Sequence, residues 1–302
     1  MHHQHVDHYF CIGSSHARAG EPCQDYALSG TLPDGRVYGI VTDGCSGANA
    51  RTDLGARVLA LCMEAELQHT TSLDDCFTPA FVQRIRQRLL AMPLGGTPQD
   101  YLASIVTFCA DGNAVRLFMA GDGAYALHRL DGSVQVTDVA WPDNAPYYLG
   151  YCLQPGVAAQ FASPATKVSA SVQLTTHSTG AGSSTREIPV QQFLNGWTVD
   201  LPLSHISALT ICSDGIAQIS GLKTLDVATT CLAFKNFEGS FVKRRTLKAL
   251  AQWKKAGHIP QDDFSIAALI GFTAGPPQGE AAGGSDPRIG GAWGPALEQG
   301  TP

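Results

Sequence analysis

The stretch VTDGCSGA at residues 41–48 decides how this chain folds, because it predicts an apolar strand that delivers one carboxylate, Asp43, at its end. Glycine follows the aspartate, and its conformational freedom lets a backbone carbonyl turn inward. Three further stretches end a predicted strand or loop in the same way: PCQDY at Asp25, ICSDG at Asp214 and QDDFS at Asp262. If the four carboxylates converge, each close pair costs about 4 kcal/mol at ~4 Å, and a hard divalent cation is the simplest relief.

Composition limits the partners and the organisation of the chain. The 302 residues are 44% hydrophobic and carry a net charge of −6, which predicts one large folded domain and argues against a nucleic-acid partner. The basic residues within 243–255 are expected on a solvated helix face. We expect a flexible His-rich N-terminus at 1–8, one domain at 9–273, and a disordered tail at 274–302, where large apolar side chains are almost absent.

The cysteines and the hydropathy indicate the compartment. Nine cysteines without a CxxC pair or a regular spacing are expected to be reduced thiols. The N-terminus has no secretory signal pattern, and no stretch of about 18 apolar residues occurs. The sequence therefore predicts a cytoplasmic protein with no membrane partner, and we expect a monomer.

Strands and helices follow one another without the regular alternation of a parallel βαβ fold. Strands are expected at 9–12 and 37–42, with a PDG turn between them. One helix should begin at Thr52 or Asp53, and a second should cover about 77–92. The segments LASIVTFCADG, AVRLFMAGDG, AYALHRLDG and VQVTD then read as strands joined by Asp-Gly turns, which predicts antiparallel hairpins.

The second half of the chain is expected to hold more helix. Residues 159–185 are rich in Ser, Thr, Ala and Gly and predict a flexible insert. A strand in ALTICSDG precedes a helical region at 216–255 that breaks near 236–239, and SIAALIGF is a last buried strand. The whole pattern predicts an α+β fold, an antiparallel β-sandwich with sheets inside and flanking α-helices outside.

The motifs QDYA, VTDGCSGA, AGDGAY, CSDG and DDFS, in this order, resemble those of the metal-dependent (PPM, type 2C) protein serine/threonine phosphatases. The opening GSSHARAGEPCQDYAL is similar to the bacterial branch of that family. The resemblance covers about 10–272, apart from the insert at 159–185. It implies a sandwich flanked by helices on both sides, and a phosphoprotein substrate, expected from a bacterial Ser/Thr kinase.

The resemblance also implies roles for the aspartates. Asp43 matches the carboxylate that bridges two metal ions, and Asp122 in AGDGAY matches a ligand of a weaker third ion. In DDFS the ligand should be Asp262, with Asp263 orienting it. Two Mn²⁺ or Mg²⁺ ions would activate a shared water for attack on phosphorus, which makes Asp25 and Asp43 the central catalytic carboxylates. The implied metal ligands are Asp25, Asp43, Gly44 through its carbonyl, Asp214, Asp262 and Asp122.

The chain departs from the family pattern at three places. Cys45 stands where many eukaryotic members have a histidine, and a packed, inert thiol is the expectation there rather than a redox switch. Gly20 stands where the family has the arginine that grips phosphate; Arg18 is near enough to substitute, and His16 is either a phosphate donor or a structural residue. Gln218 replaces a further carboxylate of the third metal site, so Asp122 could instead cap its turn.

Three other functions compete with the phosphatase. A catalytically weak pseudophosphatase or sensory binding module would keep the fold without turnover, and the missing arginine and histidine motivate it. Structural Ca²⁺ loops would need DxDxDG-like spacing, which this chain lacks. A haloacid-type phosphatase would need DxD after an apolar strand, and IVTDGCS does not supply it.

Overall fold

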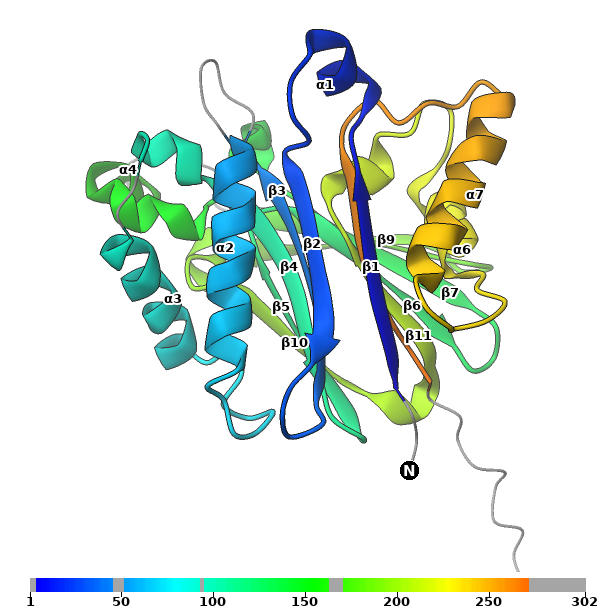
Figure 1. Ribbon diagram of the computed structural model, residues 1–302, viewed down its shortest axis with the longest axis horizontal. Helices are drawn as coiled ribbons and strands as arrows, with labels where there is room; N and C mark the ends of the chain where they lie inside the picture. Colours follow the sequence, from blue (N-terminus) through cyan, green and yellow to red (C-terminus); the bar gives the residue numbers. More distant parts are fainter. Residues whose placement is uncertain (1–3, 46–51, 93–94, 163–170, 272–302) are drawn as a thin grey trace, which may run out of the picture.

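Two antiparallel β-sheets pack face to face and carry helices on their outer faces (Figure 1). The computed structural model describes residues 4–45, 52–92, 95–162 and 171–271. The seven-stranded sheet has the order β1 (His5–Cys11), β12 (Phe264–Ile270), β11 (Ile206–Cys212), β6 (Gly123–Arg129), β7 (Val134–Ala140), β8 (Ser171–Ser178) and β9 (Gly182–Pro189). The five-stranded sheet has the order β10 (Trp197–Pro202), β5 (Ala114–Ala120), β4 (Ala103–Ala110), β3 (Val37–Gly44) and β2 (Asp25–Thr31). The predicted α+β sandwich is confirmed.

The helices lie in two groups, one on each sheet (Figure 1). Helices α2 and α3 pack on the five-stranded sheet, and α6 and α7 pack on the seven-stranded sheet. The full set is α1 (Ser14–Ala19), α2 (Thr52–Leu67), α3 (Pro79–Ala91), α4 (Pro155–Ala162), α5 (Val190–Phe193), α6 (Thr224–Leu232) and α7 (Phe241–Lys255), with 3₁₀ turns η1 (Pro98–Tyr101), η2 (Pro142–Asn144), η3 (Leu149–Leu153), η4 (Leu203–His205) and η5 (Asp214–Ala217). No helix of the described segments is long and apolar enough to cross a membrane.

Strand β3 shows why the sequence before Asp43 is almost wholly apolar. Side chains alternate between the faces of a strand, and both faces of β3 are covered. Val41 faces the layer between the two sheets, whereas Ile40 faces α2 and α3. Such a strand needs apolar residues at every position, so its sequence is a continuous run rather than an alternation.

The N-terminal strands differ from the prediction in their pairing. The PDG turn joins β2 to β3, and β2 is a strand that the sequence pattern did not predict before the turn. β1 instead pairs with β12 in the other sheet. Since β1 begins at His5, the predicted flexible N-terminus is wrong for the residues of that strand, and residues 1–3 lie outside the described part.

The AGDG stretch is a crossing between sheets and not the predicted hairpin turn. β5 belongs to the five-stranded sheet and β6 to the seven-stranded sheet, while β4–β5 and β6–β7 are the antiparallel hairpins that were expected. Gly121 and Gly123 have φ of 89° and 132°, which glycine adopts without strain. A Cβ at position 121 would also lie 2.6 Å from Cβ of Ser104, so only glycine fits at this crossing.

The predicted insert at 159–185 is partly regular structure. β8 and β9 form a hairpin that extends the seven-stranded sheet, which corrects the expectation of a loop in HSTGAGSST. Threonines occupy paired positions there, as between Thr175 and Thr185, and β-branched residues suit a half-exposed sheet. Residues 163–170 and the predicted tail at 274–302 lie outside the described part. The helical region at 216–255 is two shorter helices, α6 and α7, after the turn η5.

Candidate metal centre

Asp25 and Asp43 are direct neighbours across the β2–β3 pair. The register places them opposite one another, so both carboxylates lie on one face with Cβ atoms about 4.5–5.5 Å apart. Asp25 is buried and accepts a hydrogen bond from Ser213 Oγ at 2.7 Å. Because Ser213 follows β11, this bond joins the ends of the two sheets. The backbone N–H of Gly44 donates to the Gln24 carbonyl at 3.1 Å, which fixes the strand end beside them.

Asp214 is held at the start of η5, directly after β11. The Gln218 amide donates to Asp214 Oδ2 at 2.9 Å, so the residue in the place of the expected carboxylate orients one instead. Gly215 lets this turn lie on β12, since a Cβ there would meet the Asp263 carbonyl oxygen at 1.9 Å. The charge of Asp214 raises the pKa of Asp43, which places the two carboxylates in the same cluster.

Asp262 and Asp263 have different environments although they are adjacent. Asp263 is 2% exposed and accepts backbone N–H donors from Gly13 and Gln24, each at 2.6 Å. These bonds tie the segment before α1 and the start of β2 to β12. Asp262 is half-buried, and its charge acts on Asp43. Asp263 is therefore occupied by backbone donors, whereas Asp262 is partly exposed, and its role as a ligand stays a prediction.

His16 on α1 belongs to this cluster, which the sequence alone left open. Its Nδ1 lies 3.0 Å from Asp263 Oδ2 and 3.8 Å from Asp262 Oδ1. Among the described residues, these three side chains form the group whose ligand atoms all lie within 4.8 Å of one another. Both oxygens of Asp263 already accept backbone N–H donors, and the buried His16 Nδ1 makes no hydrogen bond with the described residues, so His16 lies against these carboxylates without being fixed by them.

Asp122 lies in the crossing between β5 and β6 and completes the cluster. Burial, together with the charge of Asp214, raises its pKa to about 7, against a hydrogen bond from Ser104 that lowers it. Ser104 is the cross-strand partner of Asp43 in the β3–β4 pair. Asp122 thus sits over the same strand ends as the other carboxylates.

The cluster is electrostatically unfavourable without a cation. Burial raises the pKa of Asp25 to about 7, against the hydrogen bond from Ser213. Burial also raises the pKa of Asp43 well above its usual range, and the charges of Asp25, Asp214, Asp122 and Asp262 add to that rise. Carboxylate oxygens are hard ligands, and a group of them that is buried close together matches the ligand preference of Mg²⁺ or Mn²⁺. The residues present therefore fit divalent metal ions.

The structure places two other predicted residues differently. Arg18 is exposed on α1, where its Nε donates to the Ser14 carbonyl at 3.0 Å, and no ion pair joins it to an aspartate within the described segments. Cys45 is half-buried, and its thiol contacts the hydroxyl of Tyr148. Burial and the nearby Asp122 raise the pKa of Tyr148, so this tyrosine lines the edge of the cluster. Nothing in the local sequence NAPYYLG indicated that position.

Asp263→Ala should destabilise the protein because it leaves two buried backbone N–H groups, those of Gly13 and Gln24, without acceptors. Each unsatisfied donor costs about 1–3 kcal/mol, so we expect a loss of roughly 2–4 kcal/mol in urea unfolding. Asp262→Ala is the matched control, because its half-buried side chain should cost about 1 kcal/mol or less. Equal losses in the two variants would contradict the assigned roles.

Comparison with known proteins yields one family and several solved structures of similar fold. The profile of the family described as Protein phosphatase 2C matches residues 12–253. A serine/threonine phosphatase of S. agalactiae is 14% identical, with a TM-score of 0.54 over 89% of this chain and 99% of that chain. The serine/threonine phosphatase Stp1 from Staphylococcus aureus is 10% identical, with a TM-score of 0.52 over 89% and 95%. At such identities the likeness shows the fold. No curated protein matches the sequence.

Proposed function

The chain belongs to the protein phosphatase 2C family, which makes it a protein serine/threonine phosphatase, and from this premise we propose that it hydrolyses phosphoserine and phosphothreonine with two divalent metal ions. The observation that carries the proposal is the convergence of carboxylates from separate parts of the chain: Asp43 lies opposite Asp25, and the charges of Asp214, Asp122 and Asp262 also act on it. An enzyme that needs cations for charge neutralisation keeps such a cluster, and a binding module has no need of it.

The residues that would hold the ions are the carboxylates already described. When bound, Mg²⁺ or Mn²⁺ lowers the pKa of a water molecule and neutralises charge on the phosphoryl oxygens. The proposed ligands are Asp25, Asp43, Asp214 and Asp262, with the Gly44 carbonyl, and with Asp122 at a weaker third ion.

The surrounding residues position these carboxylates. Ser213 donates to Asp25 and Gln218 donates to Asp214, so each of these carboxylates has one oxygen fixed by a side-chain donor. Burial raises the pKa of Tyr148, which makes this tyrosine a poor acid at neutral pH, and we assign protonation of the leaving serine or threonine oxygen to solvent. Arg18 is exposed on α1, and we propose that it contributes to the binding of the substrate phosphate. In Arg18→Ala we expect a raised KM with an unchanged kcat, and steady-state kinetics would measure this.

The proposed partner is a phosphoprotein made by a serine/threonine kinase of the same cell. Asp25 and Asp43 lie at the ends of β2 and β3, and Figure 1 shows α1 next to the upper ends of β1 and β2. A site at strand ends admits a phosphorylated side chain on a protein loop more easily than a site beneath a sheet does.

The experiment compares phosphate release from matched peptides that carry phosphoserine, phosphothreonine or phosphotyrosine. We expect release from the first two with Mn²⁺ or Mg²⁺ and none in chelator, because hydrolysis depends on the cations. The phosphotyrosine peptide is the control for residue class. A metal-loaded protein that releases phosphate from none of them would contradict the proposed function and favour a module without turnover.

A further inference from the structure

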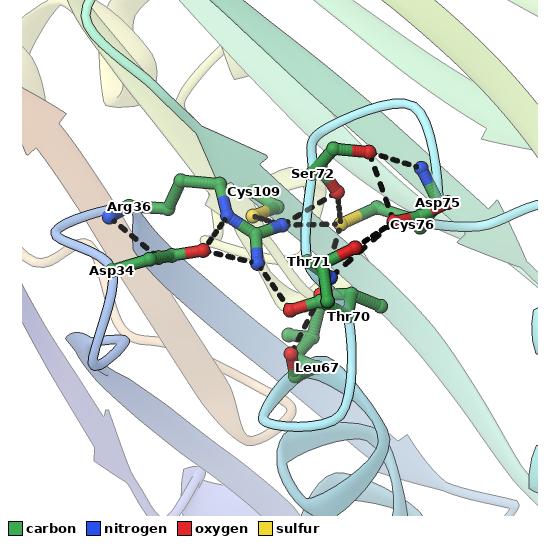
Figure 2. A network of polar contacts seen from close by, with 9 residues as sticks. All are labelled: Asp34, Arg36, Leu67, Thr70, Thr71, Ser72, Asp75, Cys76 and Cys109. Atoms are coloured by element: carbon green, nitrogen blue, oxygen red, sulfur yellow. Dashed lines mark hydrogen bonds and ion pairs between the residues drawn. The ribbon is translucent and has the colours of Figure 1, made fainter.

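Arg36 anchors a buried polar network at the end of β3 that lies farthest from Asp43 (Figure 2). Its guanidinium is 6% exposed, and an arginine carries five N–H donors. Nε and Nη2 each lie 2.7 Å from Asp34 Oδ2, and Nη2 also donates to the Thr70 carbonyl at 2.6 Å. Nη1 donates to the Ser72 carbonyl at 2.7 Å. Four donors thus have oxygen acceptors, and the fifth, on Nη1, has none among these groups.

The fifth donor points at sulfur. Nη1 lies 3.2 Å from Sγ of Cys76 and 3.9 Å from Sγ of Cys109, so two thiols share one guanidinium nitrogen (Figure 2). Cys76 comes from the segment between α2 and α3, Cys109 comes from β4, and both are fully buried. A hydrogen bond from a guanidinium is stronger when the acceptor is ionised. The geometry therefore favours a negative charge on one sulfur of the pair.

The two thiols differ in acidity in the way a reactive pair requires. The hydrogen bond from Cys109 lowers the pKa of Cys76 to about 7, with help from Arg36 and against burial. The same hydrogen bond raises the pKa of Cys109, and burial raises it further. Cys76 Sγ is also the sulfur nearer to Nη1, at 3.2 Å against 3.9 Å for Cys109, so we assign the nucleophilic thiolate to Cys76 and the proton to Cys109.

The backbone beside Cys76 is held in an unfavourable conformation. Phe77 has φ of 58°, a left-handed value that a bulky residue rarely adopts. Its ring lies 5.4 Å from the rings of both Phe81 and Phe118, and this packing keeps the turn in place. Strain of this kind persists where the surroundings fix it, and here it lies directly after the cysteine that contacts Arg36.

We propose that Cys76 and Cys109 form a dithiol that a hydroperoxide oxidises to a reversible disulfide. The Cys76 thiolate attacks one oxygen of hydrogen peroxide, the O–O bond breaks, and hydroxide leaves, which gives a sulfenic acid on Cys76. The Cys109 sulfur then attacks Cys76, the S–O bond breaks, and the proton of Cys109 leaves with that oxygen as water. The two thiols supply the two electrons that reduce the peroxide.

The dithiol is separate from the metal centre. The β3–β4 register pairs Val37 with Ala110 at one end and Asp43 with Ser104 at the other. Six residues of strand span about 20 Å, so oxidation of this pair involves none of the proposed metal ligands. The proposal therefore does not depend on the phosphatase activity.

The test treats the reduced full-length protein with hydrogen peroxide at pH 7.5, blocks free thiols by alkylation, and maps peptides by mass spectrometry without reductant. We expect a linked Cys76–Cys109 peptide pair that dithiothreitol separates. Cys62 in α2 is the internal control, because it is also buried and burial raises its pKa. In Cys109→Ser the link should be lost and dimedone should label Cys76, whereas in Cys76→Ser the Cys109 thiol should stay reduced.

Three results would overturn the proposal: both thiols remain free under peroxide, either one links to a different cysteine, or Cys62 is oxidised before Cys76. Each of these is read on the wild-type protein, so the outcome does not depend on whether the variants fold. The readout is a mass and not an activity, so failure here leaves the proposed phosphatase function untouched.

Discussion

Asp43→Asn is expected to reduce metal-dependent phosphate release by more than roughly 10²-fold. Asp43 faces Asp25 across the β2–β3 pair, and every other carboxylate of the cluster acts on it. An amide has one acceptor oxygen where the carboxylate has two and carries no charge, so asparagine would hold a divalent cation far less well. Steady-state phosphate release from a phosphothreonine peptide, measured over a range of Mn²⁺ concentrations, checks the effect.

The same variant should be more stable than the wild type in chelator at pH 8. Without metal, the wild type keeps several buried negative charges close together, and the substitution removes the most crowded one. Adding Mn²⁺ should then raise the thermal midpoint of the wild type far more than that of the variant. Asp226→Asn, on the exposed side of α6, is the matched control and should leave activity and midpoint unchanged. Full activity of Asp43→Asn would rule out the proposed ligand set.

Asp122→Asn should become more stable relative to the wild type as the pH rises from about 4 to about 7 in chelator. The folded pKa of Asp122 is raised from 3.8 to about 7, so the folded state binds this proton more tightly than the unfolded state does. In the wild type, the protonated Asp122 carboxyl therefore contributes its full stabilisation below the unfolded pKa. This stabilisation is lost as the pH rises through about 7. Asparagine has no such proton to lose.

The size of this effect follows from the shift. About three pKa units correspond to ~4 kcal/mol for a fully buried carboxyl, and partial exposure of Asp122 reduces the expected difference to ~2 kcal/mol. Urea unfolding of both proteins at pH 5, 6, 7 and 8 measures it. Asp131→Asn is the control, because hydrogen bonds from Ser133 lower the pKa of Asp131 and its difference from the wild type should stay flat over that range. A flat difference for Asp122 would contradict the burial described above.

Much of the fold could be predicted from local patterns. The exceptions are strands whose own sequences are polar or alternate only weakly. β3, β4, β11 and β12 are continuous apolar runs, and α2 and α3 show helical periodicity, so each was recognisable alone. The hairpin of β8 and β9 was missed because its Ser, Thr and Gly residues resemble a loop until neighbouring strands pair with them. β2 was missed because it begins at a polar site residue, Asp25, and alternates weakly.

The candidate site was recognisable by its aspartates but not by their supports. Asp25, Asp43, Asp214 and Asp262 each end an element in a short motif, and that signal is local. The partners of these carboxylates are distant in sequence: Ser213 is 188 residues from Asp25, and Asp263 is 250 residues from Gly13. No local pattern encodes such pairs, because they arise only when β11 and β12 bring the two ends of the chain together.

The sequence by itself therefore determined the family, the sandwich class and the carboxylates that converge, because strand periodicity and Asp-Gly turns are properties of a few adjacent residues. Only the tertiary structure decided that AGDG crosses between sheets, that Asp263 binds the backbone N–H of Gly13 before α1, and that Arg36 contacts both Cys76 and Cys109. Each of these depends on burial and on the count of hydrogen-bond donors and acceptors around a group. Those quantities exist only after distant segments have packed.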